Sequence, residues 1–400
     1  MADGRRRALT AVGGPTRQGG QDKIAKVLAR ALASVDGVDP DALTHGFHSY
    51  PARMHHMVAR TLLQAWAEPG MRVLDPFCGS GTVLIEARRA GLTAVGVDLN
   101  PVACRLATVK VDRRGNAAID RFEARAKAVV EASLVRVAER VAARAPLSAE
   151  ERQWYPPHVL RELAGLHTEI MAVDDQADRE ALRVVMSAIA VKFSKQRADT
   201  SEERVDVHVG KGTPTRFFGR KAEELAARWR ALGAEVVAKS PRATVLEGDV
   251  RELTDVVGRR GPFRLVLTSP PYGGTYDYVD HHARRYPWLG VSSKAMRSRE
   301  LGARRNLEKG GGAKSRWDEE VIEMLRAMSA VLDGGGRIVL LTGDGHVGGK
   351  RIEAVPQLQQ LASSAGLQVA AWASQPRPDF AGGPMRAEHL VALTGAARRS

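Results

Sequence analysis

The chain has 400 residues, 44% of them hydrophobic, which is enough for one large domain or two ordinary ones. No apolar run is long enough to span a bilayer, and the N-terminus lacks the apolar segment of a signal peptide. Two cysteines, Cys78 and Cys104, are too few for a disulfide framework or a cysteine-based zinc site. These features predict a cytoplasmic protein without a membrane partner, and the net charge of +14 favours a polyanion such as nucleic acid.

The first part of the chain predicts an α/β unit. Residues 1–21 have the composition of a disordered basic tail. Residues 22–68 are predicted to be helical, with a break at the loop Thr44–Met54. A short strand at Met71–Leu74, a glycine-rich turn and a helix over about 82–90 follow, and then a second strand, TAVGVD. This order of elements is typical of parallel strands joined by a helix.

The middle of the chain has a different pattern. Residues 113–240 are mostly amphipathic helix, and we interpret them as an insertion into the α/β core and a candidate target-recognition region. The core resumes with ATVLEGDV and FRLVLTS, a long polar loop to Arg316, a helix, the turn DGGG and the strand RIVLLTGDG, then one more helix and two strand-like runs. The predicted organisation is a tail at 1–21, a first part of the core at 22–112, the insertion at 113–240 and a second part of the core at 241–400.

The turn DPFCGSGT connects the first predicted strand to its helix, where α/β proteins bind ligands. Gly79 and Gly81 allow the backbone to approach a ligand closely, and Asp98 ends the next strand, where it can hold ribose hydroxyls. The third glycine of a dinucleotide motif and the Gly-Lys-Ser/Thr of a P-loop are both missing. Asp75 favours a ligand with a cationic group, such as the amino group or sulfonium of S-adenosylmethionine.

The motifs DPFCGSG, VGVDLNP, GD and TSPPY together resemble the amino-methyltransferases that modify exocyclic amines of nucleic-acid bases. The resemblance covers roughly 44–112 and 243–395. It implies a Rossmann-like class I methyltransferase core of the α/β class, with a mostly parallel seven-stranded sheet and a large helical insertion. It also implies S-adenosyl-L-methionine as cofactor. The cofactor-binding residues that it implies, including one from the segment FHSYPARM, are Tyr50, Asp75, Phe77, Gly79, Gly81, Asp98 and Asp249.

The sequence TSPPY follows an apolar run, and two successive prolines stop a strand abruptly. An exocyclic amine is a poor nucleophile because its lone pair is delocalised into the ring. The Ser269 oxygen and the Pro270 carbonyl can accept hydrogen bonds from its N–H groups and free that lone pair, while Pro271 helps to fix the geometry. Tyr272 provides a ring on which a base flipped out of the duplex can stack.

A serine at the first position of this tetrad is associated, within the family that it resembles, with cytosine N4. The resemblance therefore predicts transfer to cytosine N4 in double-stranded DNA. It also implies a cognate restriction endonuclease as a possible partner, in a restriction-modification system. Adenine N6 in DNA, a base amine in RNA and a non-catalytic nucleic-acid-binding protein remain alternatives. The residues Tyr276, Asp277 and Tyr278 either close the pocket or only pack the following loop.

The loop from His282 to Arg316 holds ten lysines and arginines against two glutamates, which predicts contacts with phosphates. The candidate nucleic-acid-binding residues are Arg284, Arg285, Lys294, Arg297, Arg304 and Arg305. Residues 192–221, with three interleaved phenylalanines, either read base edges or form a charged loop between helices. The neighbouring histidines His45, His48, His55 and His56 have no metal-binding partners that the sequence reveals, so no metal is expected.

Overall fold

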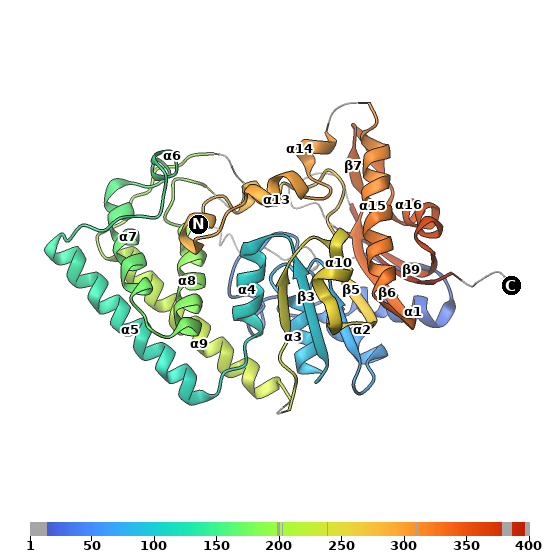
Figure 1. Cartoon of the computed structure of the whole chain (residues 1–400), viewed down its shortest axis with the longest axis horizontal. Helices are drawn as coiled ribbons and strands as arrows, with labels where there is room; N and C mark the ends of the chain where they lie inside the picture. The colour runs from blue at the N-terminus through green and yellow to red at the C-terminus, as the bar shows by residue number, and fades with distance from the viewer. Residues whose placement is uncertain are drawn as a thin grey trace.

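The computed structural model describes residues 14–197, 201, 203–237, 239–308, 311–377 and 386–396. Its centre is an eight-stranded sheet with the order β1-β9-β10-β6-β5-β2-β3-β4 (Figure 1). The strands are β1 (Arg17–Gly20), β2 (Arg72–Asp75), β3 (Thr93–Asp98), β4 (Thr244–Glu247), β5 (Phe263–Thr268), β6 (Leu332–Gly343), β9 (Leu367–Arg377) and β10 (Arg386–Gly395). A separate hairpin pairs β7 (Gly345–Val347) with β8 (Lys350–Ile352).

The five strands β4, β3, β2, β5 and β6 are parallel, whereas β10 is antiparallel to both β6 and β9. Leu74 in β2 lies beside Val95 on one side and Val266 on the other. These apolar runs are covered on both faces, as parallel strands usually are. The strand order reverses direction between β2 and β5, which is where α/β sheets bind ligands at their carboxyl ends.

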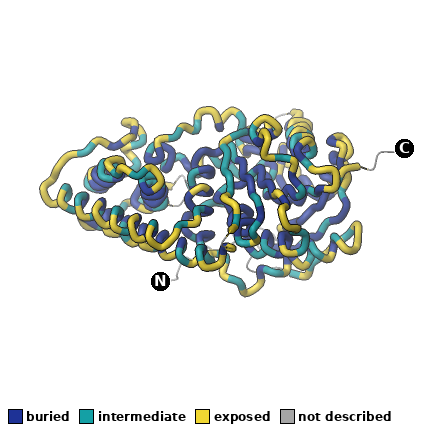
Figure 2. The backbone as a smooth tube through the Cα atoms, turned by 60° about the horizontal axis from the view of Figure 1, so that its bottom comes forward, coloured by how far each residue is buried: buried dark blue, intermediate teal, exposed yellow. Residues whose placement is uncertain are grey.

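Helices cover both faces of the sheet. On one face, α1 (Asp22–Ala33), α2 (His56–Trp66) and α3 (Thr82–Arg89) share a hydrophobic cluster with Leu265 and Leu267 of β5. On the other face, α10 (Leu253–Val257), α15 (Ala313–Ala330) and α16 (Ala354–Leu361) pack with the intervening Val266. The alternation along β5 therefore assigns neighbouring residues to opposite layers. Figure 2 shows buried segments inside this arrangement and exposed ones around its outside.

A helical bundle lies beside the sheet (Figure 1). It follows α4 (Pro101–Val111) and has its own hydrophobic core, which includes Phe122, Leu163, Phe218 and Trp229. The Trp229 indole N–H donates to the carbonyl of Val109, at 2.9 Å, and so joins the bundle to α4. Its helices are α5 (Asn116–Glu139), α6 (Ala149–Arg152), α7 (Pro157–Met171), α8 (Gln176–Ala190) and α9 (Thr213–Glu235).

The segment after β5, predicted to be a long polar loop, contains four short helices. They are α11 (Tyr278–His281), α12 (Tyr286–Leu289), α13 (Lys294–Arg299) and α14 (Arg304–Leu307). Tyr286, Trp288 and Leu289 are buried in the core of the helical bundle. Trp288 donates through its indole N–H to the Tyr155 hydroxyl at 3.0 Å, so this segment connects the bundle to the sheet.

Two further features differ from the sequence-based expectations. The sheet has eight strands instead of seven, because Arg17–Gly20, expected in the disordered tail, form β1 beside β9. The Gly19 backbone lies against the Trp372 indole, since a Cβ there would come within 2.9 Å of it, so the missing side chain permits the pairing. The predicted turn DGGG belongs to β6. Residues 1–13 of the predicted tail lie outside the described residues.

Within the described residues, no helix is both long enough and apolar enough to cross a membrane.

Candidate functional site

The glycine-rich turn between β2 and α3 depends on two glycines with positive φ. Gly79 has φ +49° and Gly81 has φ +89°, a region that side chains disfavour. A Cβ on Gly79 would approach Cε1 of Tyr50 to 3.0 Å, and a Cβ on Gly81 would approach Cα of Ala107 to 3.2 Å. Gly79 thus allows the turn to meet the loop that carries Tyr50, and Gly81 allows α4 to pack against the turn.

Two carboxyl groups stand at the ends of adjacent strands. Asp75 ends β2 and accepts a hydrogen bond from the Thr268 hydroxyl at 2.6 Å. Asp98 ends β3 and accepts the N–H groups of Gly79 and Asn100, each at 2.8 Å. Burial raises the pKa of Asp75 to about 7 and the pKa of Asp98 to about 6. A cation bound between them would stabilise their ionised forms.

These two carboxyl groups line an open cavity of about 870 Å³, a volume that includes the solvent space at its mouth. The cavity opens at the carboxyl ends of β2, β3, β4 and β5. The predicted site residues that line it are Tyr50, Asp75, Phe77, Gly79, Asp98, Asp249, Ser269 and Pro271. Gly81, Pro270 and Tyr272 do not line it.

The cavity has the chemistry that a polar, cationic cofactor requires. Thr82 Oγ1 and Asn100 Nδ2 are buried, have no hydrogen-bond partner among the described residues, and belong to residues that line the cavity. Buried polar atoms without partners are costly unless a ligand or water satisfies them. An acceptor or donor on S-adenosylmethionine would satisfy these atoms, and its positive charge would face Asp75. The residues present therefore fit this cofactor.

Asp249, one of the cofactor-binding residues that the resemblance implies, is already engaged by two arginines. Its carboxylate accepts from Arg251 at 2.6 Å and lies 2.9 Å from Nε of Arg299. Burial raises the pKa of Asp249, but the hydrogen bonds from Arg251 outweigh this effect and leave the pKa below its usual value. Arg299 belongs to α13, and Met296, Glu300 and Leu301 from the same segment also line the cavity. The sequence did not predict that α13 and the residues just after it would cover the cavity.

The TSPPY segment forms a wall between two cavities. Ser269 and Pro271 face the large cavity, while Pro270, Pro271 and Tyr272 line a smaller one of about 410 Å³. The Tyr272 ring lies close to the β6 backbone, since a Cβ on Gly343 would come within 2.9 Å of Cε2. The tetrad therefore presents its serine, but not its tyrosine ring, to the large cavity.

Aromatic rings gather at the mouth of the large cavity. Tyr278 lines it, and the Tyr50 ring stacks against His282 with centroids 5.0 Å apart. Tyr276 lies 5.6 Å from Tyr278 between ring centroids. Asp277, by contrast, pairs with Arg304 and Arg305 and so holds α14 in place. The short run TYDY thus contributes both to the cavity wall and to the packing of the loop.

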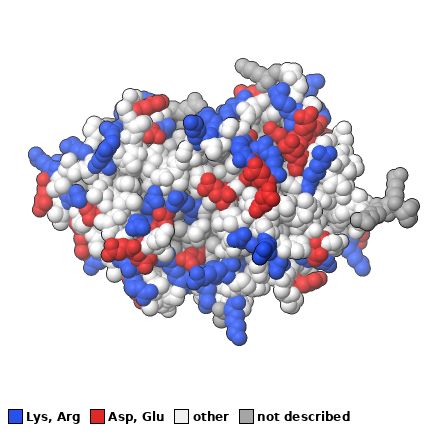
Figure 3. All heavy atoms as spheres, viewed as in Figure 1, with Lys and Arg blue, Asp and Glu red and all other residues white. Residues whose placement is uncertain are grey.

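The predicted phosphate-contacting residues differ in their surroundings. Arg285 is only 1% exposed, so its guanidinium lies inside the protein, contrary to the expected surface contact. Arg297 pairs with Asp280, Arg304 with Glu308 as well as Asp277, and Arg305 with Glu300. On the face shown in Figure 3, basic and acidic side chains lie interleaved over α13, α14 and α15. Carboxylates from inside and outside the loop therefore offset much of its charge.

The remaining candidates, Lys294 and Arg284, have no ion pair among the described residues. Lys294 is exposed, and Arg284 lies over the Trp154 ring with Cζ 4.1 Å from its centroid. Residues 192–221 contain three phenylalanines, and two of them, Phe193 and Phe218, are buried in the bundle core. Their burial removes them as base-reading residues.

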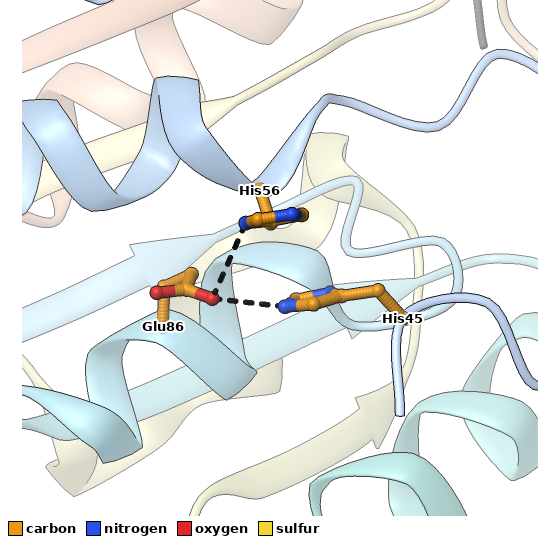
Figure 4. A group of neighbouring side chains, drawn as sticks. All are labelled: His45, His56 and Glu86. Carbon is orange, nitrogen blue, oxygen red and sulfur yellow. Dashed lines mark hydrogen bonds and ion pairs between the residues drawn. The ribbon is translucent and has the colours of Figure 1, made fainter. Parts of the chain in front are cut away.

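A buried cluster of His45, His56 and Glu86 lies behind the cavity (Figure 4). Nε2 of His45 is 2.9 Å from Oε1 of Glu86, and the two imidazole rings stack with centroids 4.8 Å apart. Oε2 of Glu86 also accepts from Arg60 at 2.9 Å and from Arg89 at 2.7 Å. The guanidinium groups of Arg60 and Arg89 already pair with the carboxylate. The arrangement therefore suits an ion-pair network better than a metal ion.

This network fixes the loop that carries Tyr50. Lys110 is fully buried, and its Nζ donates to the His45 carbonyl at 3.0 Å and lies 3.0 Å from the Ser80 hydroxyl. It thereby joins the loop at 44–54 to the glycine-rich turn. Glu86 is the partner that the sequence did not reveal, since it lies 41 residues from His45.

The strand order, with a reversed β10 inserted between β6 and β9 and carboxyl groups at the ends of β2 and β3, defines a Rossmann-like class I methyltransferase core. Residues 28–109 match the family model described as DNA methylase, N6_N4_Mtase. This match covers about a fifth of the chain, and over this segment the chain is similar to the N6/N4 DNA methylases.

Three relatives match short parts of the chain. The type II methyltransferase M.MjaII of Methanocaldococcus jannaschii is 32% identical over 69 residues, 17% of this chain and 13% of that protein. M.MvaI of Kocuria varians is 38% identical over 71 residues, covering 17% and 16%. The tRNA (guanine(10)-N2)-dimethyltransferase of Methanothermobacter thermautotrophicus is 42% identical over 52 residues, covering 13% and 16%. Each match thus spans less than a fifth of the relative's length.

Among solved structures, the rRNA methyltransferase aviRa of Streptomyces viridochromogenes aligns over 90% of this chain and 94% of its own, with 14% identity and a TM-score of 0.35. This likeness is too low to carry an argument, so the assignment of the fold rests on the strand order.

Proposed function

We propose that the protein transfers a methyl group from S-adenosylmethionine to the exocyclic amine of a flipped base in double-stranded DNA, and that this amine is cytosine N4. One observation carries the proposal. Asp75, Asp98 and Ser269, which come from the ends of three neighbouring strands, line a single cavity. The cofactor residues and the first residue of the amine-binding tetrad are therefore within reach of one another.

The cofactor, when bound, supplies an electrophilic methyl group. The ionised Asp75 carboxylate binds its cationic amino group, and Asp98 accepts hydrogen bonds from the ribose hydroxyls. Gly79 and Gly81 keep the turn close enough for these contacts, with Tyr50 and Phe77 as apolar walls. Asp249 acts at the adenine end through the arginines that it anchors, since Arg299 fastens α13 over the cavity.

The tetrad prepares the amine. The Ser269 hydroxyl and the Pro270 carbonyl accept its N–H groups, which favours a pyramidal nitrogen with a free lone pair. Pro271 fixes the wall on which these acceptors lie, so their alignment requires little reorganisation during the reaction. In this proposal the flipped base enters by the smaller cavity that Pro270, Pro271 and Tyr272 line, and its amine reaches Ser269 at the wall between the two cavities. There the base stacks on Tyr272, which offsets part of the cost of unstacking it, roughly a few kcal/mol.

The family description names DNA, and this favours DNA over the RNA substrate named for one relative. In this proposal the partners are duplex DNA and, if the gene lies in a restriction-modification system, a cognate endonuclease. No metal takes part in the reaction.

Transfer of labelled methyl from S-adenosylmethionine to genomic DNA and to total RNA tests the proposal. We expect label in DNA and about a 100-fold slower transfer by Ser269→Ala, the loss typical of removing one aligned hydrogen-bonding group. Ser298→Ala, which changes an exposed serine of α13, is the matched control and should keep full activity. Label confined to RNA would contradict the substrate, and an unimpaired Ser269→Ala would contradict the role of the tetrad.

A further inference from the structure

Three basic side chains of the helical bundle, and Arg284 near the start of the loop after TSPPY, differ from most other basic residues of that loop. These four lie against aromatic rings instead of carboxylates. Cζ of Arg204 and of Arg284 lie 4.3 Å and 4.1 Å from the centroid of Trp154. Nζ of Lys192 lies 4.9 Å and Cζ of Arg220 lies 5.2 Å from the centroid of Phe217. None of the four has a carboxylate within ion-pair distance in the described part of the chain.

Neighbouring acidic residues are engaged elsewhere. Glu151 forms a capping box with Ser148, and Glu203 pairs with Arg197. Glu162 is buried and accepts the backbone N–H groups at the start of α9. Within the part of the chain that the structure describes, the positive charges of the four stacked side chains are therefore not paired with a carboxylate. Stacking on an aromatic ring orients a guanidinium or ammonium group without neutralising it.

The two stacks are joined to each other and to the mouth of the large cavity. The backbone N–H of Lys195 donates to the Trp154 carbonyl at 2.7 Å, three residues after Lys192. Arg284 follows two residues after His282, whose ring stacks on Tyr50. On α9, one turn after Phe217, Lys221 donates to the Phe47 carbonyl at 2.9 Å. Figure 1 shows α6, just before Trp154, on the same upper side as α13 and α14.

We propose that this surface, the stacked basic face, contacts the phosphate backbone of duplex DNA beside the flipped base. Its members are Trp154, Lys192, Arg204, Phe217, Arg220 and Arg284. The inference rests on the proposed function and assigns the main phosphate contacts to a surface formed by the helical bundle and Arg284, instead of to the rest of the loop after TSPPY. Duplex DNA fits because free cations held at fixed positions neutralise phosphates and release counterions.

The salt dependence of DNA binding tests this proposal directly. The triple variant Lys192→Gln, Arg204→Gln, Arg220→Gln removes three exposed charges and leaves the half-buried Arg284 in place. The probe is a short fluorescent duplex of mixed sequence, titrated at several salt concentrations. Each lost phosphate contact lowers the slope of log affinity against log salt by about 0.9, so we expect a slope smaller by about 2 to 3 and at least roughly tenfold weaker binding.

The matched control is Arg121→Gln, Lys127→Gln, Arg259→Gln, which removes three exposed charges from α5 and from the loop before β5. It should bind with the wild-type slope. Unchanged S-adenosylmethionine affinity shows that both triple variants are folded. If the wild type methylates DNA but the first triple variant keeps its slope and affinity, the inference is wrong and the proposed function stands. If the wild type neither binds nor methylates the duplex, the proposed function itself fails.

Discussion

Cofactor binding should depend on pH because Asp75 must be ionised to bind a cation. Burial raises the pKa of Asp75 to about 7, even though the Thr268 hydroxyl and the Phe77 N–H favour its ionised form. Only about one tenth of the protein then carries the carboxylate at pH 6, against about nine tenths at pH 8. Apparent affinity scales with this fraction, so S-adenosylmethionine should bind about tenfold more weakly at pH 6 than at pH 8.

Calorimetric titration at pH 6, 7 and 8, in buffers with different ionisation enthalpies, measures both the affinity and the proton release. We expect about half a proton to be released on binding at pH 7. Asp75→Asn should bind more weakly at pH 8 and should lose most of the pH dependence. A wild-type dissociation constant that stays within about twofold from pH 6 to pH 8, without proton release, would refute the reasoning.

The same carboxyl group has the opposite effect on the unliganded protein. Its folded pKa lies above the value of an unfolded chain, so its contribution to stability is complete below the unfolded pKa. That contribution is lost as the pH rises through about 7.

Three further outcomes are expected. Tyr272→Ala should abolish methyl transfer but leave S-adenosylmethionine affinity within about twofold by calorimetry, since Tyr272 does not line the large cavity; a large loss of affinity would contradict this. Glu86→Gln should lower the free energy of unfolding in urea by about 3 kcal/mol, because it leaves buried partners unpaired. Glu235→Gln, which removes a partly exposed partner of Arg89, should lower it by less than about 1 kcal/mol, and equal losses would contradict the burial argument. Dialysis against EDTA should leave the melting temperature unchanged, and a rise in it on adding zinc would reveal a metal site.

The sequence predicted those strands and turns that depend on residues close together in the chain. The strands ending at Asp75 and Asp98 follow from short apolar runs, and the turn between them from glycines at fixed positions. The strand β1 could not be predicted, because its partner β9 lies about 350 residues further along the chain and its own composition is polar.

The site could be predicted only to the extent that its residues belong to contiguous motifs. Asp75, Asp98 and Ser269 fall together because parallel strands end at one edge of the sheet. Arg299 over the cavity and Glu86 beneath the histidines depend on contacts between distant segments. The excess positive charge of residues 282–316 was overestimated for the same reason. Asp277 and Asp280, which pair with arginines of this loop, lie before its first residue.

The most direct test of the central claim is the identity of the methylated nucleoside. Genomic DNA is incubated with the protein and labelled S-adenosylmethionine, digested to nucleosides and analysed by mass spectrometry. The account predicts N4-methylcytosine, formed by the wild type and absent with Ser269→Ala. Label in N6-methyladenine would contradict the assignment of the base, and label found only in RNA nucleosides would contradict the assignment of DNA as the substrate.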